Sequence, residues 1–378
     1  MAREIFLDQL ANAHEAVQAA VAELEAGNLV CLPDECGWNL LGLSTRESVA
    51  NALNGGQALN GNRNRLSGVQ EVVSIAHPSV VSDFVTNPSR LFQKLSARCW
   101  PGPVVLRAFQ GDSTSNGLIS QWPAGAREWA ATDQGRAFYC PADSFAQEVL
   151  RAVSAPGLSL LGSSTEILSH LPAAALTIHA GSSRFSLPPT VVGVGKKRFQ
   201  IEHSGVVSER MLTRLAGEVY LFVCTGNTCR SPMAEAIFRK MLADHLHCRE
   251  DELMDHGYVV ISAGLAAYHG APASPESLAL LRDDGIDLSA HESQPVTEEL
   301  LLHCDQILTM TRNHRDAVLS TYPELARQVR LLSPHSEDVP DPFGASVEDY
   351  VRCRNIITEC LKQLLAEIDA NDREGNGA

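Results

Sequence analysis

The stretch that decides the fold of the second half of the chain is Val219-Tyr220-Leu221-Phe222-Val223-Cys224-Thr225-Gly226-Asn227-Thr228-Cys229-Arg230-Ser231-Pro232. Its first five residues are apolar, and a helical pattern runs from Ala234 to Leu246 after it. This order predicts a strand, a tight loop and a helix. We interpret the loop as an anion-binding loop with a nucleophile at its base.

The residue types of the loop suit a bound phosphate. Backbone N–H groups of a tight loop converge on an anion, and the N-terminus of the following helix adds its dipole. Gly226 permits backbone angles that other residues resist, and Asn227 tolerates a left-handed conformation. The residues expected to bind the phosphate are Thr225, Gly226, Asn227, Thr228, Cys229, Arg230 and Ser231.

Three further side chains give the loop its chemistry. Arg230 offers a planar fork to two phosphate oxygens. Ser231 is expected as the N-cap of the helix, with Pro232 in the first turn. Cys224, kept as a thiolate by the same field, is positioned to attack phosphorus in line. For Cys229 two interpretations stay open: a reversible disulfide with Cys224, or simple loop packing.

A second stretch, Asp338-Val339-Pro340-Asp341-Pro342-Phe343-Gly344, supplies the acid that such a reaction needs. Asp341 stands between two prolines and therefore on a stiff loop. Alone, a Pro-Asp-Pro turn is more often structural. Beside the cysteine loop, we predict that Asp341 protonates the leaving atom and then activates water against a phosphocysteine intermediate.

Composition sets the broad class. A chain of 378 residues is long enough for about two domains. No apolar run approaches the length that spans a bilayer, and the N-terminus lacks the pattern of a signal peptide. We therefore expect a cytoplasmic protein whose ten cysteines are thiols, with no membrane association.

The net charge of −15 is unevenly distributed. Residues 1–215 hold 17 Lys and Arg against 18 Asp and Glu, whereas residues 216–378 hold 13 against 27. A strongly acidic half does not attract nucleic acid, so a nucleic-acid partner is not expected. The simplest interpretation of the acidity is a solvated surface.

We place a domain boundary near Ala216-Gly217, giving domains 1–215 and 216–378, both of the α/β class. In the second domain, strands and helices alternate, which predicts a parallel sheet with helices on both faces and a site at the carboxyl ends of the strands. The expected elements there are strands 219–223, 258–262, 306–310 and 329–332 and helices 232–246, 275–284, 297–304, 313–319 and 347–368. In the first domain we expect strands 29–32, 72–75, 104–108, 158–161, 176–179 and 190–194, helices 16–26, 48–53, 89–99 and 207–215, a mobile loop at 55–67 and an insertion at 111–135.

Residues 218–369 resemble the low-molecular-weight protein tyrosine phosphatases. The resemblance rests on the loop from Cys224 to Pro232, Ser262-Ala263-Gly264, Gly285-Ile286-Asp287-Leu288-Ser289 with His291 and Ser293, Leu308-Thr309-Met310-Thr311, and Asp341-Pro342. It implies a cysteine-dependent phosphatase of phosphorylated proteins that needs no metal or other cofactor. It also implies Cys224 as nucleophile, Arg230 as phosphate clamp, Ser231 as thiolate stabiliser and Asp341 as general acid. Asn227 and Ser262 would brace the loop together.

Two details are similar to the bacterial protein arginine phosphatase branch of that family: Thr228 in the loop and Phe343 after Asp341-Pro342. A small polar residue at 228 favours a planar, cationic guanidinium over a phenyl ring, and Asp341 would attract that cation. Phosphoarginine is therefore the favoured substrate group, with phosphotyrosine as the alternative.

Other functions and a metal site fit the sequence less well than a phosphatase. Arsenate reductases share the loop but need a relay cysteine where this chain has Met310-Thr311-Arg312. Sulfur transfer leaves Asp341 unexplained. A phosphate-recognition scaffold without catalysis is a separate alternative. His245, His247 and Cys248 are interpreted as a polar helix end and not a metal site, because their spacings do not share a helix face.

The first domain resembles the threonylcarbamoyl-AMP synthase family in order and spacing. The residues that carry this are Pro33-Asp34-Glu35, Trp100-Pro101-Gly102-Pro103, Pro189-Thr190-Val191-Val192 and Gly205-Val206-Val207. The family's chemistry is altered. The family's Lys-x-Arg motif would fall near residues 55–66, which contain no lysine and only the arginines Arg63 and Arg65. The family's Ser-Ala-Asn motif is replaced by Ser163-Ser164-Thr165. Pro189 stands where the family has the serine of its Ser-Thr-Val motif. We expect a fold kept without synthase activity, with such activity as the alternative.

Overall fold

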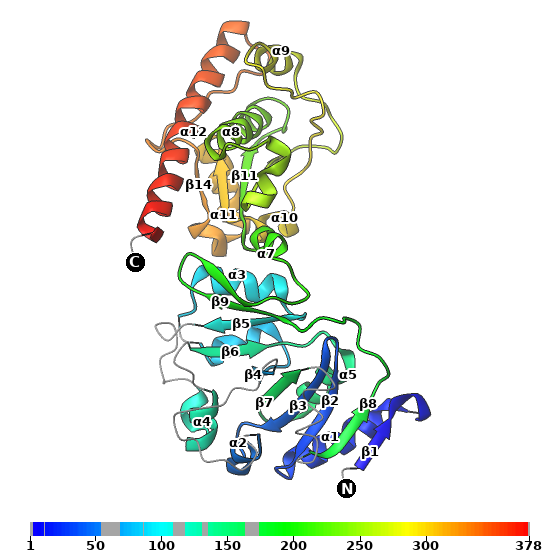
Figure 1. The fold of residues 1–378 in the computed structure, drawn as a ribbon. Helices are drawn as coiled ribbons and strands as arrows, with labels where there is room; N and C mark the ends of the chain where they lie inside the picture. The colour runs from blue at the N-terminus through cyan, green and yellow to red at the C-terminus, as the bar shows by residue number, and fades with distance from the viewer. Residues whose placement is uncertain are drawn as a thin grey trace. The chain divides into compact units, whose positions relative to one another are not determined.

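The computed structural model describes residues 3–10, 12–53, 69–85, 87–108, 118–130, 135–162 and 174–376, with side chains up to residue 370. Within it the chain forms two compact units, Met1–Leu215 and Ala216–Ala378. Both units contain helices and strands, so the predicted α/β class is confirmed (Figure 1). The expected loop at 55–67, residues 111–117 and 131–134 of the expected insertion at 111–135, and Ser163-Ser164-Thr165 lie outside the described residues.

The first unit is built on one mixed sheet. Among the described residues it has ten strands in the order β1-β8-β2-β3-β7-β4-β6-β5-β9-β10. The strands are β1 (Arg3–Phe6), β2 (Leu29–Asp34), β3 (Gly37–Leu43), β4 (Gln70–Ser74), β5 (Val104–Ala108), β6 (Arg136–Tyr139), β7 (Gly157–Gly162), β8 (Ala174–His179), β9 (Thr190–Val194) and β10 (Phe199–His203). The helices are α1 (Ala13–Glu25), α2 (Glu47–Leu53), α3 (Arg90–Cys99), α4 (Ala124–Ala130), α5 (Ser144–Ala152) and α7 (Glu209–Ala216), with short 3-10 turns Leu7–Gln9, Pro78–Asp83 and Leu118–Gln121.

Helices α1 and α5 cover one part of this sheet because their apolar faces match the strands beneath. Buried residues of both helices form a single cluster with residues of β2, β3 and β8. Each helix begins at a side-chain cap: Asn12 accepts the N–H of His14, and Asp143 accepts the N–H of Ala146. The capped start of α5 matters for the cavity described below.

The sequence expectations for this unit were incomplete. Strand β2 was expected to end before Pro33, but it continues to Asp34. Its pairing with β8 ends at Cys31, whereas its pairing with β3 continues to Asp34. Pro33 therefore lies where β2 has a partner on one side only, and the missing N–H of proline is tolerated at such an edge. Strands β1, β3, β6 and β10 and helix α5 were not predicted, and α4 lies inside the expected insertion at 111–135. Most of the unpredicted elements are short, or follow no clear apolar alternation.

The second unit has a parallel sheet in the order β12-β11-β13-β14 among the described residues. Its strands are β11 (Glu218–Cys224), β12 (Tyr258–Gly264), β13 (Gln306–Thr309) and β14 (Val329–Leu331). Its helices are α8 (Arg230–Leu246), α9 (Pro275–Asp283), α10 (Glu298–His303), α11 (Arg312–Thr321) and α12 (Val347–Asn376), with 3-10 turns Glu250–His256 and Pro323–Arg327. Every strand and helix predicted for this unit is present. The bounds differ by at most two residues, except that α12 continues to Asn376 where an end at 368 was expected.

Strand β11 lies inside this sheet and is buried from both sides. Tyr220 and Phe222 pack with α8, α9 and α12, whereas Leu221 and Val223 pack with α10 and α11. Alternate residues of a strand point to opposite faces, so one apolar run serves two cores. The predicted sheet with helices on both faces is thus confirmed, and β11 delivers Cys224 to its carboxyl end (Figure 1).

Candidate active site

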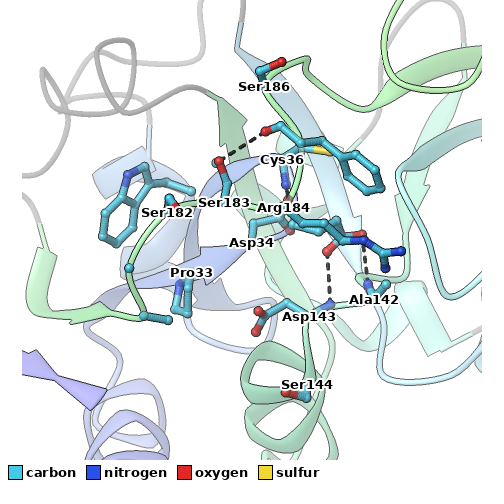
Figure 2. Close-up of a pocket in the computed structure, with 16 residues that line it drawn as sticks. Pro33, Asp34, Cys36, Ala142, Asp143, Ser144, Ser182, Ser183, Arg184 and Ser186 are labelled. Carbon is cyan, nitrogen blue, oxygen red and sulfur yellow. Dashed lines mark hydrogen bonds between the residues drawn. The ribbon is translucent and has the colours of Figure 1, made fainter. Parts of the chain in front are cut away.

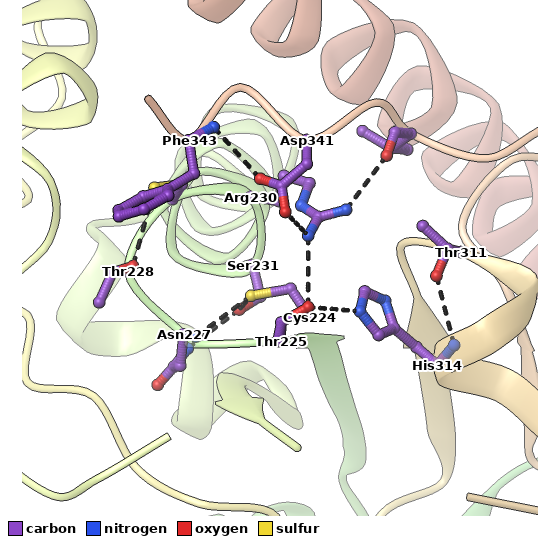
Figure 3. A network of polar contacts seen from close by, with 12 residues as sticks. Cys224, Thr225, Asn227, Thr228, Arg230, Ser231, Thr311, His314, Asp341 and Phe343 are labelled. Atoms are coloured by element: carbon purple, nitrogen blue, oxygen red, sulfur yellow. Dashed lines mark hydrogen bonds and ion pairs between the residues drawn. The ribbon is translucent and has the colours of Figure 1, made fainter. Parts of the chain in front are cut away.

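The sulfur of Cys224 stands at the end of β11, within hydrogen-bond distance of two groups of the loop. The backbone N–H of Asn227 donates to Sγ at 3.2 Å, and the Ser231 hydroxyl lies 2.9 Å from it (Figure 3). Cys224 is buried, at 3% exposure. This arrangement suits a nucleophile.

Asn227 holds the loop in shape. Its φ of 54° is left-handed, as the sequence predicted. Its side-chain amide donates to Ser231 at 3.0 Å and to Ser262 on β12 at 2.8 Å, and its amide oxygen accepts the N–H of Gln294 at 2.9 Å. The bracing of the loop by Asn227 and Ser262 is therefore seen directly. Ser262 in turn donates to Glu235 of α8 at 2.6 Å.

Two local expectations for the loop were wrong. Gly226 does not have a left-handed φ, and a Cβ there would meet only the Thr228 hydroxyl at an ordinary 3.7 Å. Ser231 is not the N-cap, because α8 begins at Arg230 with Cys229 in the cap position. The Ser231 hydroxyl is directed instead to Cys224 and Asn227, which places it beside the sulfur.

The glycine that the loop requires is Gly264, at the end of the neighbouring strand β12. A Cβ at this position would lie 2.6 Å from the carbonyl oxygen of Thr225 and 2.8 Å from the backbone nitrogen of Asn227. Both are backbone atoms of the loop and cannot give way cheaply. The turn Ser262-Ala263-Gly264, noted in the sequence, therefore owes its glycine to the close approach of the loop.

Arg230 and Asp341 meet although 111 residues separate them. Arg230 is buried, and its Nη2 donates to Asp341 Oδ2 at 2.5 Å, while its Nη1 donates to the Val339 carbonyl at 3.3 Å (Figure 3). The Asp341 side chain is 50% exposed. The stiff acid loop thus brings its carboxylate to the edge of the cysteine loop, and one guanidinium group connects the two.

Sequence reasoning missed His314. It is the third residue of α11, whose N-cap, Thr311, accepts its N–H at 3.2 Å. Its ring Nε2 lies 2.9 Å from the hydroxyl of Thr225. Burial, and then the charge of Arg230, lower the pKa of His314 to about 4, so the ring is neutral near pH 7. Thr311 at a strand end, followed three residues later by His314, was the available signal.

Thr228 and Cys229 occupy the far side of the loop. The Thr228 carbonyl accepts the N–H of Ser274 at 2.8 Å, and the Cys229 sulfur lies 3.4 Å from the Tyr350 hydroxyl of α12. Cys229 belongs to the apolar core between the sheet and helices α8 and α12, so packing explains a small apolar residue at this position. Neither Cys224 nor Cys229 takes part in a disulfide in this structure. Phe343, two residues after Asp341, is 75% exposed, and its N–H donates to Asp341 Oδ1 at 3.3 Å.

Known proteins match this unit. The family "Low molecular weight phosphotyrosine protein phosphatase" matches residues 219–374. The protein-arginine-phosphatase of Bacillus subtilis is 36% identical over 157 residues, which are 40% of this chain and 98% of the relative. The chain belongs to the low molecular weight phosphotyrosine protein phosphatase family. Its second unit is therefore a cysteine-based protein phosphatase domain, a hydrolase.

Relatives of the phosphatase domain carry two substrate names. The protein-arginine-phosphatase of Geobacillus stearothermophilus is 35% identical over 151 residues, 39% of this chain and 93% of the relative. The low molecular weight protein-tyrosine-phosphatase PtpB of Staphylococcus haemolyticus is 38% identical over 131 residues, 34% of this chain and 84% of the relative. These identities are too similar to choose between the two substrates.

Outside the phosphatase domain, the first unit contains a cavity of about 700 Å³ between the end of β2, the start of α5 and the segment 180–186 that follows β8 (Figure 2). Glu35 lines it and accepts the N–H groups of Ala142 and Asp143 at 2.9 and 3.1 Å. Asp34 is buried and accepts from the Tyr139 hydroxyl. Burial, and then the charge of Glu35, raise the pKa of Asp34 to about 8. Backbone donors of this cavity are thus occupied by the protein's own carboxylates.

At the polar end of α8, both histidines have contacts within the protein. His245 pairs with Asp369 at 2.8 Å, and His247 is the left-handed C-cap of the helix. In the part of the chain that the structure describes, no group of three or more metal-ligand side chains comes together. Among the same residues, no helix is both long and apolar enough to cross a lipid bilayer.

Proposed function

We propose that this phosphatase domain hydrolyses phosphorylated side chains of proteins through a phosphocysteine intermediate formed on Cys224. The observation that carries the proposal is the convergence of Cys224, Arg230 and Asp341 at the end of one central strand. A bound phosphoryl group would take Arg230 as its clamp and the loop N–H groups as further donors. Ser231, 2.9 Å from the sulfur, would stabilise the thiolate.

In the first step the Cys224 sulfur forms a bond to phosphorus, the bond from phosphorus to the leaving atom breaks, and Asp341 gives that atom its proton. In the second step Asp341 takes a proton from water, the water oxygen bonds to phosphorus, and the sulfur–phosphorus bond breaks. Inorganic phosphate leaves, and Cys224 and Asp341 return to their starting forms. Exposure of half of the Asp341 side chain gives it access to both the leaving atom and water.

Hydrolysis of p-nitrophenyl phosphate tests this function against a scaffold that only recognises phosphate. We expect turnover by the full chain and none by Cys224→Ser, which should still bind inorganic vanadate or phosphate weakly. The matched control is Cys353→Ser, since Cys353 is a buried core thiol of α12 outside the loop. A wild-type chain that binds phosphate without turnover would establish the scaffold function instead.

We further propose phosphoarginine as the preferred substrate group. Thr228 is small and polar, and Asp341 at the rim would attract a guanidinium cation. Phe343, exposed on the same loop as Asp341, would stack on the planar group. Two of the relatives above are named arginine phosphatases, which supports the choice without deciding it.

Peptides that carry phosphoarginine or phosphotyrosine, compared on wild type and Thr228→Ile, test the preference. We expect wild type to favour phosphoarginine by about ten-fold or more in kcat/KM, and the isoleucine variant to shift toward phosphotyrosine. Thr228→Ser is the control that keeps a small hydroxyl and should keep the preference. Equal preference for phosphotyrosine in wild type and Thr228→Ile would end the arginine hypothesis in favour of tyrosine.

For residues 1–215 we propose a threonylcarbamoyl-AMP synthase-like domain that has lost its activity. The cavity bordered by Pro33-Asp34-Glu35 supports this, because Asp34 and Glu35 accept backbone N–H groups of the cavity wall that an anionic substrate would need. Arg184 is the single cation among the described residues that line it (Figure 2). The test is turnover of ATP, threonine and bicarbonate by the full chain; clear formation of the adenylate product would refute the loss of activity.

A further inference from the structure

Thr225 and His314 form a contact that the proposed reaction does not yet use. Thr225 follows the nucleophile directly in the chain and is solvent-exposed, whereas His314 is 7% exposed. The ring Nε2 of His314 lies 2.9 Å from Thr225 Oγ1, and Arg230 Nη2 donates to the same oxygen at 3.5 Å. Figure 3 shows this hydroxyl between the guanidinium and the imidazole.

Counting protons fixes the direction of these hydrogen bonds. A threonine hydroxyl has one proton and accepts two hydrogen bonds, and arginine only donates. Burial and the charge of Arg230 keep the His314 ring neutral near pH 7, against the smaller opposite effects of Asp341 and Asp338. A neutral imidazole carries its proton on one nitrogen alone.

The surroundings of the other ring nitrogen select the tautomer. Nδ1 of His314 is buried and has no hydrogen-bond partner among the described residues. A proton on Nδ1 would bury an unpaired N–H, and orphaned donors are rarer in proteins than under-used acceptors. The proton therefore belongs on Nε2, which then donates to Thr225. With both lone pairs of Oγ1 filled, by His314 and Arg230, the Thr225 proton is left to point outward.

We propose that His314 is a positioning residue that orients the Thr225 hydroxyl as a donor to an oxygen of the bound phosphoryl group. The loop N–H groups and Arg230 bind the same group, so Thr225 adds a neutral, fixed donor next to the nucleophile. A donor held in advance costs no reorganisation when charge develops on the phosphoryl oxygens. This inference rests on the proposed phosphatase function and adds a specific side-chain contact to it.

A double-mutant cycle with inorganic vanadate as the probe tests the proposal. In the full chain, Thr225→Val should raise the inhibition constant for vanadate by about ten-fold, because one hydrogen bond to a charged group is lost. Thr225→Ser keeps the hydroxyl and should stay within about three-fold of wild type. His314→Leu should weaken the binding of vanadate when Thr225 is present, but it should have no further effect on binding when combined with Thr225→Val. His314→Gln, which offers a side-chain N–H, should recover part of the loss.

An equal loss from His314→Leu with and without Thr225→Val would overturn the proposal, because His314 would then act through another contact. An unchanged vanadate constant in Thr225→Val would overturn it as well. The p-nitrophenyl phosphate assay separates these outcomes from a failure of the proposed function. A wild-type chain without turnover refutes the phosphatase function. An active wild-type chain whose double-mutant cycle shows no coupling between Thr225 and His314 refutes only the role of these two residues.

The tautomer gives a second readout, which is measured on the wild-type chain. Long-range ¹H–¹⁵N spectra of the wild-type chain near pH 7 distinguish a protonated Nε2 with bare Nδ1 from the converse, with His314→Gln used only to assign the signal. We expect the Nε2-protonated form. The Nδ1-protonated form would mean that Thr225 donates to His314, which would leave no proton for a phosphoryl oxygen and would refute the proposal.

Discussion

The ion pair between Arg230 and Asp341 predicts that one substitution strengthens phosphate binding and weakens catalysis. Arg230 is the expected phosphate clamp, yet its Nη2 is bound to Asp341 Oδ2 at 2.5 Å. A phosphate dianion must therefore displace a carboxylate and then sit beside its negative charge. Asp341→Asn keeps the shape of the side chain and removes that charge, so the variant should bind inorganic phosphate more tightly than wild type.

The size of the effect follows from burial. The Arg230 side chain is 5% exposed, but that of Asp341 is 50% exposed. Two unit charges at 4 Å interact by about 1 kcal/mol in water and about 4 kcal/mol at an effective dielectric constant of 20. Because solvent screens the exposed carboxylate, the lower value applies. A change of about 1 kcal/mol corresponds to roughly five-fold tighter phosphate binding. Loss of the general acid should lower kcat by about 10² to 10⁴.

Isothermal titration with inorganic phosphate, beside kcat for a phenyl phosphate with a poor leaving group, measures both effects. Asp338→Asn is the matched control: it removes the same charge from the same loop, but Asp338 accepts the N–H of Arg312 and does not pair with Arg230. The gain in phosphate affinity should shrink as salt rises. Equal or weaker phosphate binding by Asp341→Asn than by Asp338→Asn would refute competition for Arg230.

Three other predictions come from single buried positions. The pKa of His314 is lowered from 6.5 to about 4, so the unfolded chain binds a proton at this residue before the folded chain does as pH falls. The free energy of unfolding should therefore decrease between pH 6.5 and 4. In His314→Gln, the urea concentration at the unfolding midpoint should decrease less over the same range. The pKa of Asp34 is raised from 3.8 to about 8, so the stability that it contributes is complete below pH 3.8 and is lost as pH rises toward 8. Asp34→Asn should therefore make the melting temperature of the first unit fall less steeply over this pH range. An unchanged slope would mean that Asp34 is ionised in the native state. Gly264→Ala places a Cβ 2.6 Å from the Thr225 carbonyl, so we expect at least ten-fold lower kcat/KM with p-nitrophenyl phosphate; wild-type activity would show that the loop tolerates the shift.

The second unit was predictable from sequence because its signals are local. An apolar run before Cys224, a turn-forming Asn227 and a helical period after Pro232 each act within a few residues. All of them appear in the structure, with small differences in bounds. The first unit was less predictable, because strands such as β3 and β6 are stabilised by their neighbours in a mixed sheet and not by a clear alternation of their own.

By itself, the sequence determined the order of strand, loop and helix in the second unit and the resemblance of residues 218–369 to the low-molecular-weight phosphatases, which the comparisons confirm. Only the tertiary structure decided which side chains meet: Arg230 with Asp341, Thr225 with His314, and Gly264 with the loop backbone. It also moved Ser231 from the helix cap to the sulfur of Cys224. The physical reason is distance along the chain: local propensities act over a few residues, whereas these contacts join elements that only the register of a parallel sheet brings to one edge.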